Sequence, residues 1–187
     1  MRILPRHLLL LLAVPGVAAA AAAAPDYDLL EGLADQTTGA TGRELGLQLN
    51  GSYWMGDGFF AEGSVSRLHD GDAPGGLDAD RDFAGLGLRA HFELTDVFLS
   101  VDWLHLHQDA DGVGSSQDGY RWVWGLRSAV SEDLELNFGI EKSSVGEDHL
   151  GLRLGESFAL TDRLGLRAQY VHFPDAHSWV LGLRYYY

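Results

Sequence analysis

Histidine and aspartate side chains gather near the long, acidic connections of this chain, and they are the groups most able to bind a metal ion. Six of the eight histidines belong to this set, which is His69, His105, His107, His149, His172 and His177, together with Asp70, Asp72, Asp109 and Asp148. His105 and His107 would share one face of a strand, so they could hold one ion with a neighbouring carboxylate. Solvated loop side chains account for the same pattern with fewer assumptions. The sequence therefore predicts no metal site and no cofactor.

Calcium-binding and hydrolase motifs are incomplete. The segments Asp70-Gly-Asp72 and Asp78-Ala-Asp80 lack the glycine and the bidentate glutamate of an EF-hand loop. The segment Gly155-Glu-Ser157-Phe-Ala159 lacks the second glycine of a nucleophile elbow and falls within a predicted strand. The chain has no cysteine, so it has no disulfide, no catalytic thiol and no cysteine for a lipid anchor. No catalytic residue is predicted.

Length, charge and the N-terminal segment predict one exported domain. The 187 residues carry a formal net charge of -14, which argues against nucleic acid as a partner. Residues 1–24 contain two arginines, an apolar run and an alanine tract, the pattern of a cleaved secretory signal peptide. No later stretch approaches the roughly 20 apolar residues of a membrane-spanning helix. Residues 25–187 are therefore predicted to form a single domain after export.

The C-terminal segment shows the strand pattern that organises the rest of the chain. Apolar and aromatic residues occupy every second position on one face of this segment: Trp179, Leu181, Leu183, Tyr185 and Tyr187. A chain that ends on such a strand must pair both edges of the strand or leave an aggregation-prone edge, and a closed barrel pairs both. The same period of two residues recurs from Tyr27 onward and predicts about ten strands, with eight as the alternative. The predicted fold is all-β, an antiparallel up-and-down barrel.

Short and long connections alternate between the predicted strands. Short turns at 55–58, 95–96, 131–133 and 161–163 alternate with acidic connections that include 70–82, 109–118 and 145–148. In an up-and-down barrel this alternation places the short turns at one end and the long loops at the other, as in bacterial outer-membrane barrels. Both termini are then expected at the short-turn, periplasmic end.

The polar face of the strands distinguishes a membrane barrel from a soluble, lipid-binding one. A soluble exported barrel would carry many lysine, glutamate and threonine side chains on its solvated outer face. This chain has a single lysine, Lys142, and its polar strand positions are mostly glycine, serine and isolated arginine. Small residues with spaced arginines suit a crowded interior, whereas the opposite face carries leucine with aromatic residues near the strand ends. The sequence therefore predicts a transmembrane barrel.

The chain resembles the small bacterial outer-membrane β-barrels of OmpA/OmpX-like architecture, which have eight strands. The resemblance rests on the signal peptide, the alternating strands and the terminal segment 179–187. The terminal aromatic residue, with apolar residues at alternate positions before it, resembles the signal by which the barrel-assembly machinery recognises its clients. The segment Leu49-Asn50-Gly51-Ser52 and the ten-strand layout are also similar to a small-barrel family once described as a quorum-sensing or plant-immunity factor. The resemblance implies outer-membrane lipid and lipopolysaccharide as surroundings and offers no catalytic residues.

Projecting the polar faces inward places charges of both signs in one lumen. The predicted lumen charges are Glu62, Arg89, Glu93, Asp102, Arg121, Arg127, Glu135, Glu141, Arg153, Arg167 and Arg184. Charges confined in such a space must pair. A barrel of eight strands is filled by side chains whereas one of roughly 16 leaves an aqueous channel, so ten strands lie close to the filled limit. We expect a largely occluded lumen and a structural or surface-interaction role, with a narrow porin-like channel as the alternative.

An outer-membrane protease is a further alternative, since ten-stranded enzymes of that kind carry paired aspartates and Asp-His couples at their outer rim. The strands of those enzymes rise far above the bilayer and form a cleft, whereas the strands of about 10 residues predicted here only span it. The sequence therefore favours a protein that is not an enzyme.

Overall fold

The computed structural model describes residues 27–39, 42–70, 77–110, 113–145 and 150–187. The predicted signal peptide at 1–24 lies outside these residues, as do Asp72, Asp148 and His149. Within the described ranges, no helix is long and apolar enough to cross a membrane. All elements are strands: β1 (Leu29–Gly39), β2 (Gly42–Gly56), β3 (Phe59–Asp70), β4 (Leu77–Phe92), β5 (Thr95–Ala110), β6 (Val113–Ala129), β7 (Leu134–Ser143), β8 (Leu150–Ala159), β9 (Leu164–His172) and β10 (Ala176–Tyr186).

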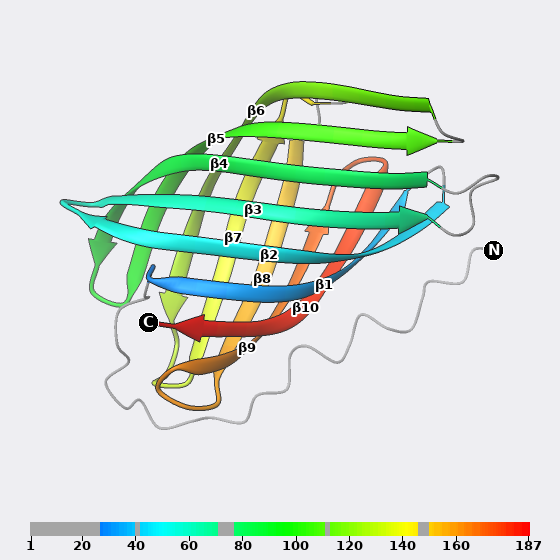
Figure 1. Cartoon of the computed structure of the whole chain (residues 1–187). Helices are drawn as coiled ribbons and strands as arrows, with labels where there is room; N and C mark the ends of the chain where they lie inside the picture. Colours follow the sequence, from blue (N-terminus) through cyan, green and yellow to red (C-terminus); the bar gives the residue numbers. More distant parts are fainter. Residues whose placement is uncertain (1–26, 40–41, 71–76, 111–112, 146–149) are drawn as a thin grey trace, which may run out of the picture.

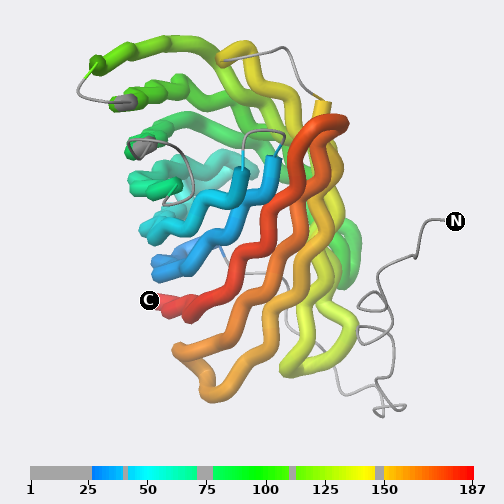
Figure 2. The backbone as a smooth tube through the Cα atoms, turned by 90° about the vertical axis from the view of Figure 1, so that its right-hand side faces the viewer, coloured from blue at the N-terminus to red at the C-terminus, as the bar shows by residue number. Residues whose placement is uncertain are grey.

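The ten strands form one closed antiparallel barrel in which each strand pairs with its neighbours in the chain (Figure 1). The barrel closes where β1 pairs with β10, in a register that joins Leu29 to Tyr186 and Gly39 to Ala176. Figure 2 shows this seam as the blue β1 lying beside the red β10. Closure pairs both edges of the sheet along the seam, and the first residues of β6, before Arg121, extend beyond its pairing with β7. The predicted barrel is confirmed, with ten strands and not eight.

Alternate residues on each strand face opposite sides of the wall, and the outer side is the apolar one. On β5, Leu99 and Trp103 point outward and are 44% and 50% exposed, whereas Ser100 and Asp102 between them point inward and are buried. A soluble barrel places its apolar residues inside, so this polarity is the reverse of the soluble alternative. The buried polar side chains make the lumen the place where chemistry or recognition can occur.

The strands differ in length, and this departs from the sequence-based expectation of about 10 residues each. β4, β5 and β6 have 16, 16 and 17 residues, whereas β7, β8 and β9 have 10, 10 and 9. Six extra residues add about 20 Å of strand. Figure 1 shows the long strands β3 to β6, coloured cyan to green, lying side by side. One side of the barrel is therefore built from much longer strands than the other.

The extra length comes from segments that were predicted to be loops. Residues 77–82 of the connection predicted at 70–82 belong to β4, and most of the connection predicted at 109–118 belongs to β5 and β6. Their aspartate, glycine and serine content is low in strand propensity, but the backbone ladders of neighbouring strands continue through them. Cross-strand hydrogen bonding outweighs local propensity here.

The short connections lie at the end of the barrel where the described chain begins and ends. Tyr187, just beyond β10, donates its backbone amide to the carbonyl oxygen of Asp28, just before β1. The turn between β2 and β3 holds Asp57 and Gly58 at φ values of 50° and 86°, the left-handed region that tight hairpin turns require. The predicted position of the termini is confirmed for the described residues, and we call this end the short-turn end and the other the long-loop end.

Candidate functional site

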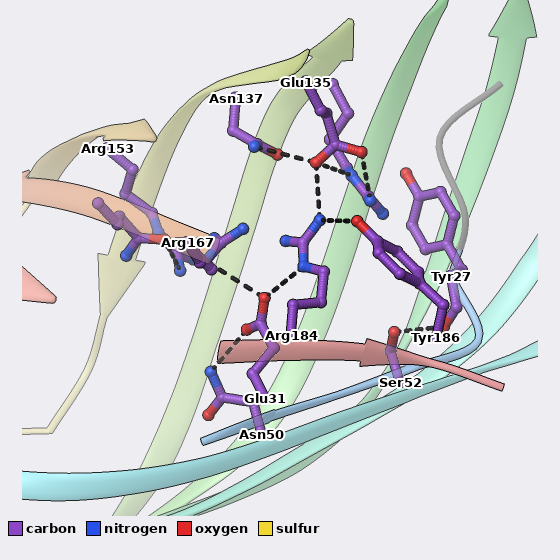
Figure 3. Close-up of polar contacts among 12 residues, drawn as sticks. Tyr27, Glu31, Asn50, Ser52, Glu135, Asn137, Arg153, Arg167, Arg184 and Tyr186 are labelled. Atoms are coloured by element: carbon purple, nitrogen blue, oxygen red, sulfur yellow. Dashed lines mark hydrogen bonds and ion pairs between the residues drawn. The ribbon is translucent and has the colours of Figure 1, made fainter. Parts of the chain in front are cut away.

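A bridge of ion pairs crosses the lumen from the seam of the barrel to β7 (Figure 3). Arg184 on β10 donates from Nε to Glu31 on β1 at 2.7 Å, and from Nη1 to Glu135 on β7 at 2.9 Å. Arg127 on β6 donates to both oxygens of Glu135, from Nη2 at 2.7 Å and from Nε at 3.3 Å. All four side chains are buried. The guanidinium of Arg184 thus ties the closing seam to a strand three places away in the sheet.

The register of the strands explains why these four residues meet. Glu31 and Arg184 are direct partners across the β1–β10 seam, although 153 residues separate them in the chain. Glu135 lies opposite Ala129 next to the β6–β7 turn, and Arg127 is the next inward residue along β6. Opposite charges on neighbouring inward positions can form charge-assisted hydrogen bonds without backbone distortion.

Neutral amides and a further arginine supply the remaining hydrogen bonds of the two carboxylates. Asn50 donates to Glu31 at 3.2 Å, and Asn137 donates to Glu135 at 3.1 Å. The Nε of Arg167 lies 3.3 Å from an oxygen of Glu31. Buried charges are tolerated only when they are paired and their lone pairs are satisfied, so these contacts allow two carboxylates to remain ionised inside the barrel.

A second charge cluster lies nearer the middle of the lumen. Arg121 on β6 donates from Nε to Asp102 on β5 at 2.8 Å, and its Nη2 lies 3.9 Å from Glu62 on β3. The same guanidinium lies over the ring of Phe83, 3.5 Å from its centroid, which adds a cation–π interaction. On the facing strands, Arg153 pairs with Glu141 at 3.2 Å.

A third cluster closes the short-turn end. Asp96, which is fully buried, accepts from Arg89 at 3.0 Å and contacts Nδ1 of His91 at 2.6 Å. The guanidinium of Arg89 lies 4.0 Å from the ring centroid of Trp54 and 4.9 Å from that of Tyr27. Stacked aromatic and guanidinium groups of this kind exclude water well. The end of the lumen is filled by side chains rather than by loops.

Ten of the eleven predicted lumen charges lie on the inward face, and one prediction is wrong. Glu93 is exposed and has a φ of 54° in the tight turn between β4 and β5, because the strand ends at Phe92 and the alternation stops there. Two central residues, Glu31 and Asp96, were not predicted. Asp96 carries a usable signal, since it lies two residues from Phe98 and four from Ser100 on one face of β5.

Two cavities lie along the part of the lumen that the described residues enclose. The lower cavity has a volume of about 130 Å³ and lies among the bridging residues, including Tyr27, Glu31 and Arg184. The upper cavity has a volume of about 240 Å³ and extends to the β9–β10 connection at the long-loop end. Both are lined by the same five side chains, which form a shared waist: Gln48, Phe83, Arg121, Arg153 and Gln169. The arginine and carboxylate groups therefore narrow the lumen without filling all of it.

Among the predicted histidines, His177 borders the upper cavity, whereas His69 and His105 lie on the outer face of the barrel. Nδ1 of His105 is 2.7 Å from Asp118, and Nδ1 of His69 is 2.6 Å from Asp78. Their rings point away from the lumen, since Leu104 between the outward Trp103 and His105 is the buried residue. Among the described residues, no group of three or more histidine and acidic side chains could hold a metal ion.

The predicted assembly signal occupies the outer face of β10 and the residue after it. Leu181, Leu183 and Tyr185 on β10 are exposed, as is the terminal Tyr187, whose hydroxyl donates to the carbonyl oxygen of Ser52 on β2 at 3.0 Å. Trp179 packs on Tyr170 of β9, with ring centroids 4.7 Å apart. These positions are accessible from outside the barrel, and their role in assembly stays a prediction.

No protein-family description matches this sequence, and no curated protein matches it either. The similarity lies in the fold. The structure resembles the KdgM porin, with a TM-score of 0.52 and 9% sequence identity over 85% of this chain and 99% of that one. It resembles the NanC porin equally well, with a TM-score of 0.52 and 9% identity over 84% of this chain and 100% of that one.

Neisserial surface protein A matches with a TM-score of 0.43 and 12% identity, over 85% of this chain and 95% of that one. All three are outer-membrane β-barrels. At these levels of identity the KdgM and NanC matches establish the fold alone, which is that of the outer-membrane β-barrels. The porins among the neighbours are not enzymes.

Proposed function

We propose that this chain is a small, non-enzymatic β-barrel of the bacterial outer membrane with a structural or surface-interaction role, and that its lumen is largely occluded. The observation that carries the proposal is the buried bridge from Glu31 through Arg184 to Glu135. An open pore of this width would need its charged side chains held against the wall. Here the longest of them reach across the lumen and bind one another.

The outer face supports the proposed location. Leucine and valine side chains form an exposed band around the barrel, and aromatic residues lie near its edges, as at the Trp103–Tyr120 pair with ring centroids 5.1 Å apart. Such a band suits the hydrocarbon core of a bilayer, and aromatic residues favour its interfaces. The partners expected from this surface are outer-membrane lipid, lipopolysaccharide and, during biogenesis, the barrel-assembly machinery.

Planar-bilayer recording of the refolded protein tests occlusion. We expect at most a small ion leak from the native chain. The double variant Arg127→Ala/Arg153→Ala should raise the conductance and lower the thermal stability together, because each truncation widens the lumen and removes a cationic partner, from Glu135 or from Glu141. Arg67→Ala is the matched control, since Arg67 points outward and its side chain is 88% exposed. A large, steady conductance from the native chain would contradict the proposal.

A narrow channel for ions or small solutes is the second candidate. It is favoured by the two cavities, which lie in line and meet at the shared waist around Arg121 and Arg153. Two of the structures with a similar fold are porins. In this case the native protein should conduct steadily, and Arg153→Ala alone should increase the current, because Arg153 lines both cavities.

A further inference from the structure

The upper cavity differs from the rest of the lumen because two facing sides of its wall are apolar. Its residues on β4 and β5 and on the facing β9–β10 side are large hydrocarbons and aromatic rings: Phe83, Leu104, Leu106, Val171, Phe173 and Val180. Leu104, Val171 and Val180 are buried, so water does not reach them. These side chains give the cavity an apolar surface that the hydrocarbon part of a ligand can cover.

The wall between these two apolar sides is polar. It is formed mainly by hydroxyl, amide and carboxylate groups of β1 to β3 and β10: Asp35, Thr37, Gln48, Ser64, Ser66 and Ser178. Asp35 accepts hydrogen bonds from Thr37 and Ser178, and Ser64 accepts one from Gln48. These groups already satisfy one another. They can orient a bound molecule, and they do not require that molecule to carry a charge.

Arg81 on β4 is the cationic group of this cavity that stays available. Arg121 and Arg153 at the waist are bonded to Asp102 and Glu141. Glu44 lies close enough to Arg81 to act on it through space, but among the described residues no carboxylate comes within ion-pair distance of the Arg81 guanidinium. One planar guanidinium beside an apolar wall matches a single carboxylate, which it can bind through two parallel hydrogen bonds.

We propose that the upper cavity binds a small amphipathic carboxylic acid, whose apolar body lies against Leu104, Leu106 and Phe173 and whose carboxylate binds Arg81. The charged side chains that reach the cavity are three of each sign, Asp35, Glu141 and Asp175 against Arg81, Arg121 and Arg153. A second negative charge on the ligand would therefore find no spare partner. This site goes beyond the proposed function, since it exists whether or not the barrel conducts.

The cavity volume sets the size of the ligand. About 240 Å³ lies just below the range of typical small-molecule sites, so the occupant has about 10 to 14 non-hydrogen atoms. A ligand of that size with ordinary efficiency binds with a Kd on the order of 100 µM. 4-Phenylbutyrate, a monocarboxylate with an aromatic body, is a suitable probe.

Titration calorimetry of the full-length mature protein in lipid nanodiscs, with empty nanodiscs as the blank, tests the site. We expect saturable binding of 4-phenylbutyrate, much weaker binding of the neutral 4-phenylbutanol, and no binding of acetate, which lacks the apolar body. The blank is needed because the probe partitions into lipid.

Two variants separate the carboxylate contact from the apolar wall. Arg81→Gln should weaken 4-phenylbutyrate binding about ten- to hundredfold, the range of one charge-assisted contact, and should abolish the preference over 4-phenylbutanol. Leu106→Gln should weaken both compounds alike. Arg67→Gln is the matched control: Arg67 lies on the neighbouring strand β3 but faces outward and pairs with Asp80, so it should bind like the native chain.

Heat-modifiable mobility on a gel establishes that each variant is folded. Binding no greater than to empty nanodiscs would overturn the proposal, and so would equal binding of the acid and the alcohol or an unchanged Kd in Arg81→Gln. None of these results bears on conductance, which is measured separately.

Discussion

The short-turn half and the long-loop half of the barrel place opposite kinds of side chain on the inner face of the wall. In the short-turn half, the inner face of β5 carries Asp96, Ser100 and Asp102, and the outer face carries leucine and valine. In the long-loop half of the same strand, the inner residues are Leu104 and Leu106, and the outer ones are histidines. The alternation of period two continues through β5, but its polarity reverses.

In the proposed outer-membrane location, this reversal marks a change in what surrounds the barrel. It falls next to Trp103, which packs edge-on against Tyr120 at 5.1 Å, and on the far side of the barrel the outer face carries the similar pair Tyr170 and Trp179. Aromatic residues of this kind favour the interface between lipid and water. Above that level the outer face is solvated and the inner face can be apolar, as in a soluble barrel. One strand thus carries polar inner residues in its short-turn half and apolar inner residues in its long-loop half.

The charge bridge of the short-turn half should be the feature whose loss costs most. Arg184→Ala leaves Glu31 and Glu135 buried with fewer partners, so we expect a loss of about 3–5 kcal/mol in the free energy of unfolding. Urea unfolding of the protein refolded in lipid vesicles measures it. Arg67→Ala, at an exposed outer pair with Asp80, should cost under about 1 kcal/mol.

The reason for that loss can be checked in the same assay. Replacing Glu31, Arg127, Glu135, Arg167 and Arg184 together by methionine removes all five interacting charges and roughly keeps the volume, so most of the stability should return. A loss in Arg184→Ala no larger than in Arg67→Ala would show that the bridge does not stabilise the barrel.

A matched pair on the outer face of β5 tests the polarity reversal itself. Leu99→Arg places a charge in the middle of the apolar band and should cost about 2–4 kcal/mol, whereas His105→Arg, six residues along the same face, should cost about 0–1 kcal/mol. Leu99 is exposed and lies between Leu88 and Trp124 on the neighbouring strands. Equal costs at the two positions, measured by urea unfolding in vesicles, would mean that the apolar band does not end near Trp103.

The sequence predicted the barrel and most inward charges because the period of two residues is a local property. Arg127 and Arg153 could be assigned to the lumen from their leucine neighbours alone. Glu31 could not, because both faces of β1 mix apolar and polar residues, with Leu29 and Leu33 beside Glu31 on the inner one. Only closure against β10, which brings Arg184 opposite, identifies its role.

The upper cavity was missed for a related physical reason. Periodicity identifies two faces but not which of them meets lipid, and it carries no sign of a change in polarity partway along a strand. Leu104 and Leu106 therefore offered no sign of an apolar inner wall. The strand segments at 77–82 and 113–118 were taken as loops because their composition disfavours strands, and only the ladder with their neighbours holds them.

The smallest expected effect on stability belongs to Tyr187, and it separates folding from recognition. Tyr187 is 60% exposed at the short-turn end, and Tyr53 on β2 is 58% exposed on the outer face near the same end. Tyr187→Lys and Tyr53→Lys should therefore both change the free energy of unfolding by under about 1 kcal/mol, as charged substitutions near the edge of the apolar band do.

If the terminal aromatic residue is the assembly signal, only Tyr187→Lys should lower the amount of heat-modifiable protein in the outer membrane, as quantified by immunoblot of membrane fractions. An equal fall in both variants would assign the effect to a general loss of aromatic surface, and unchanged levels in Tyr187→Lys would remove the role of the terminal residue in assembly.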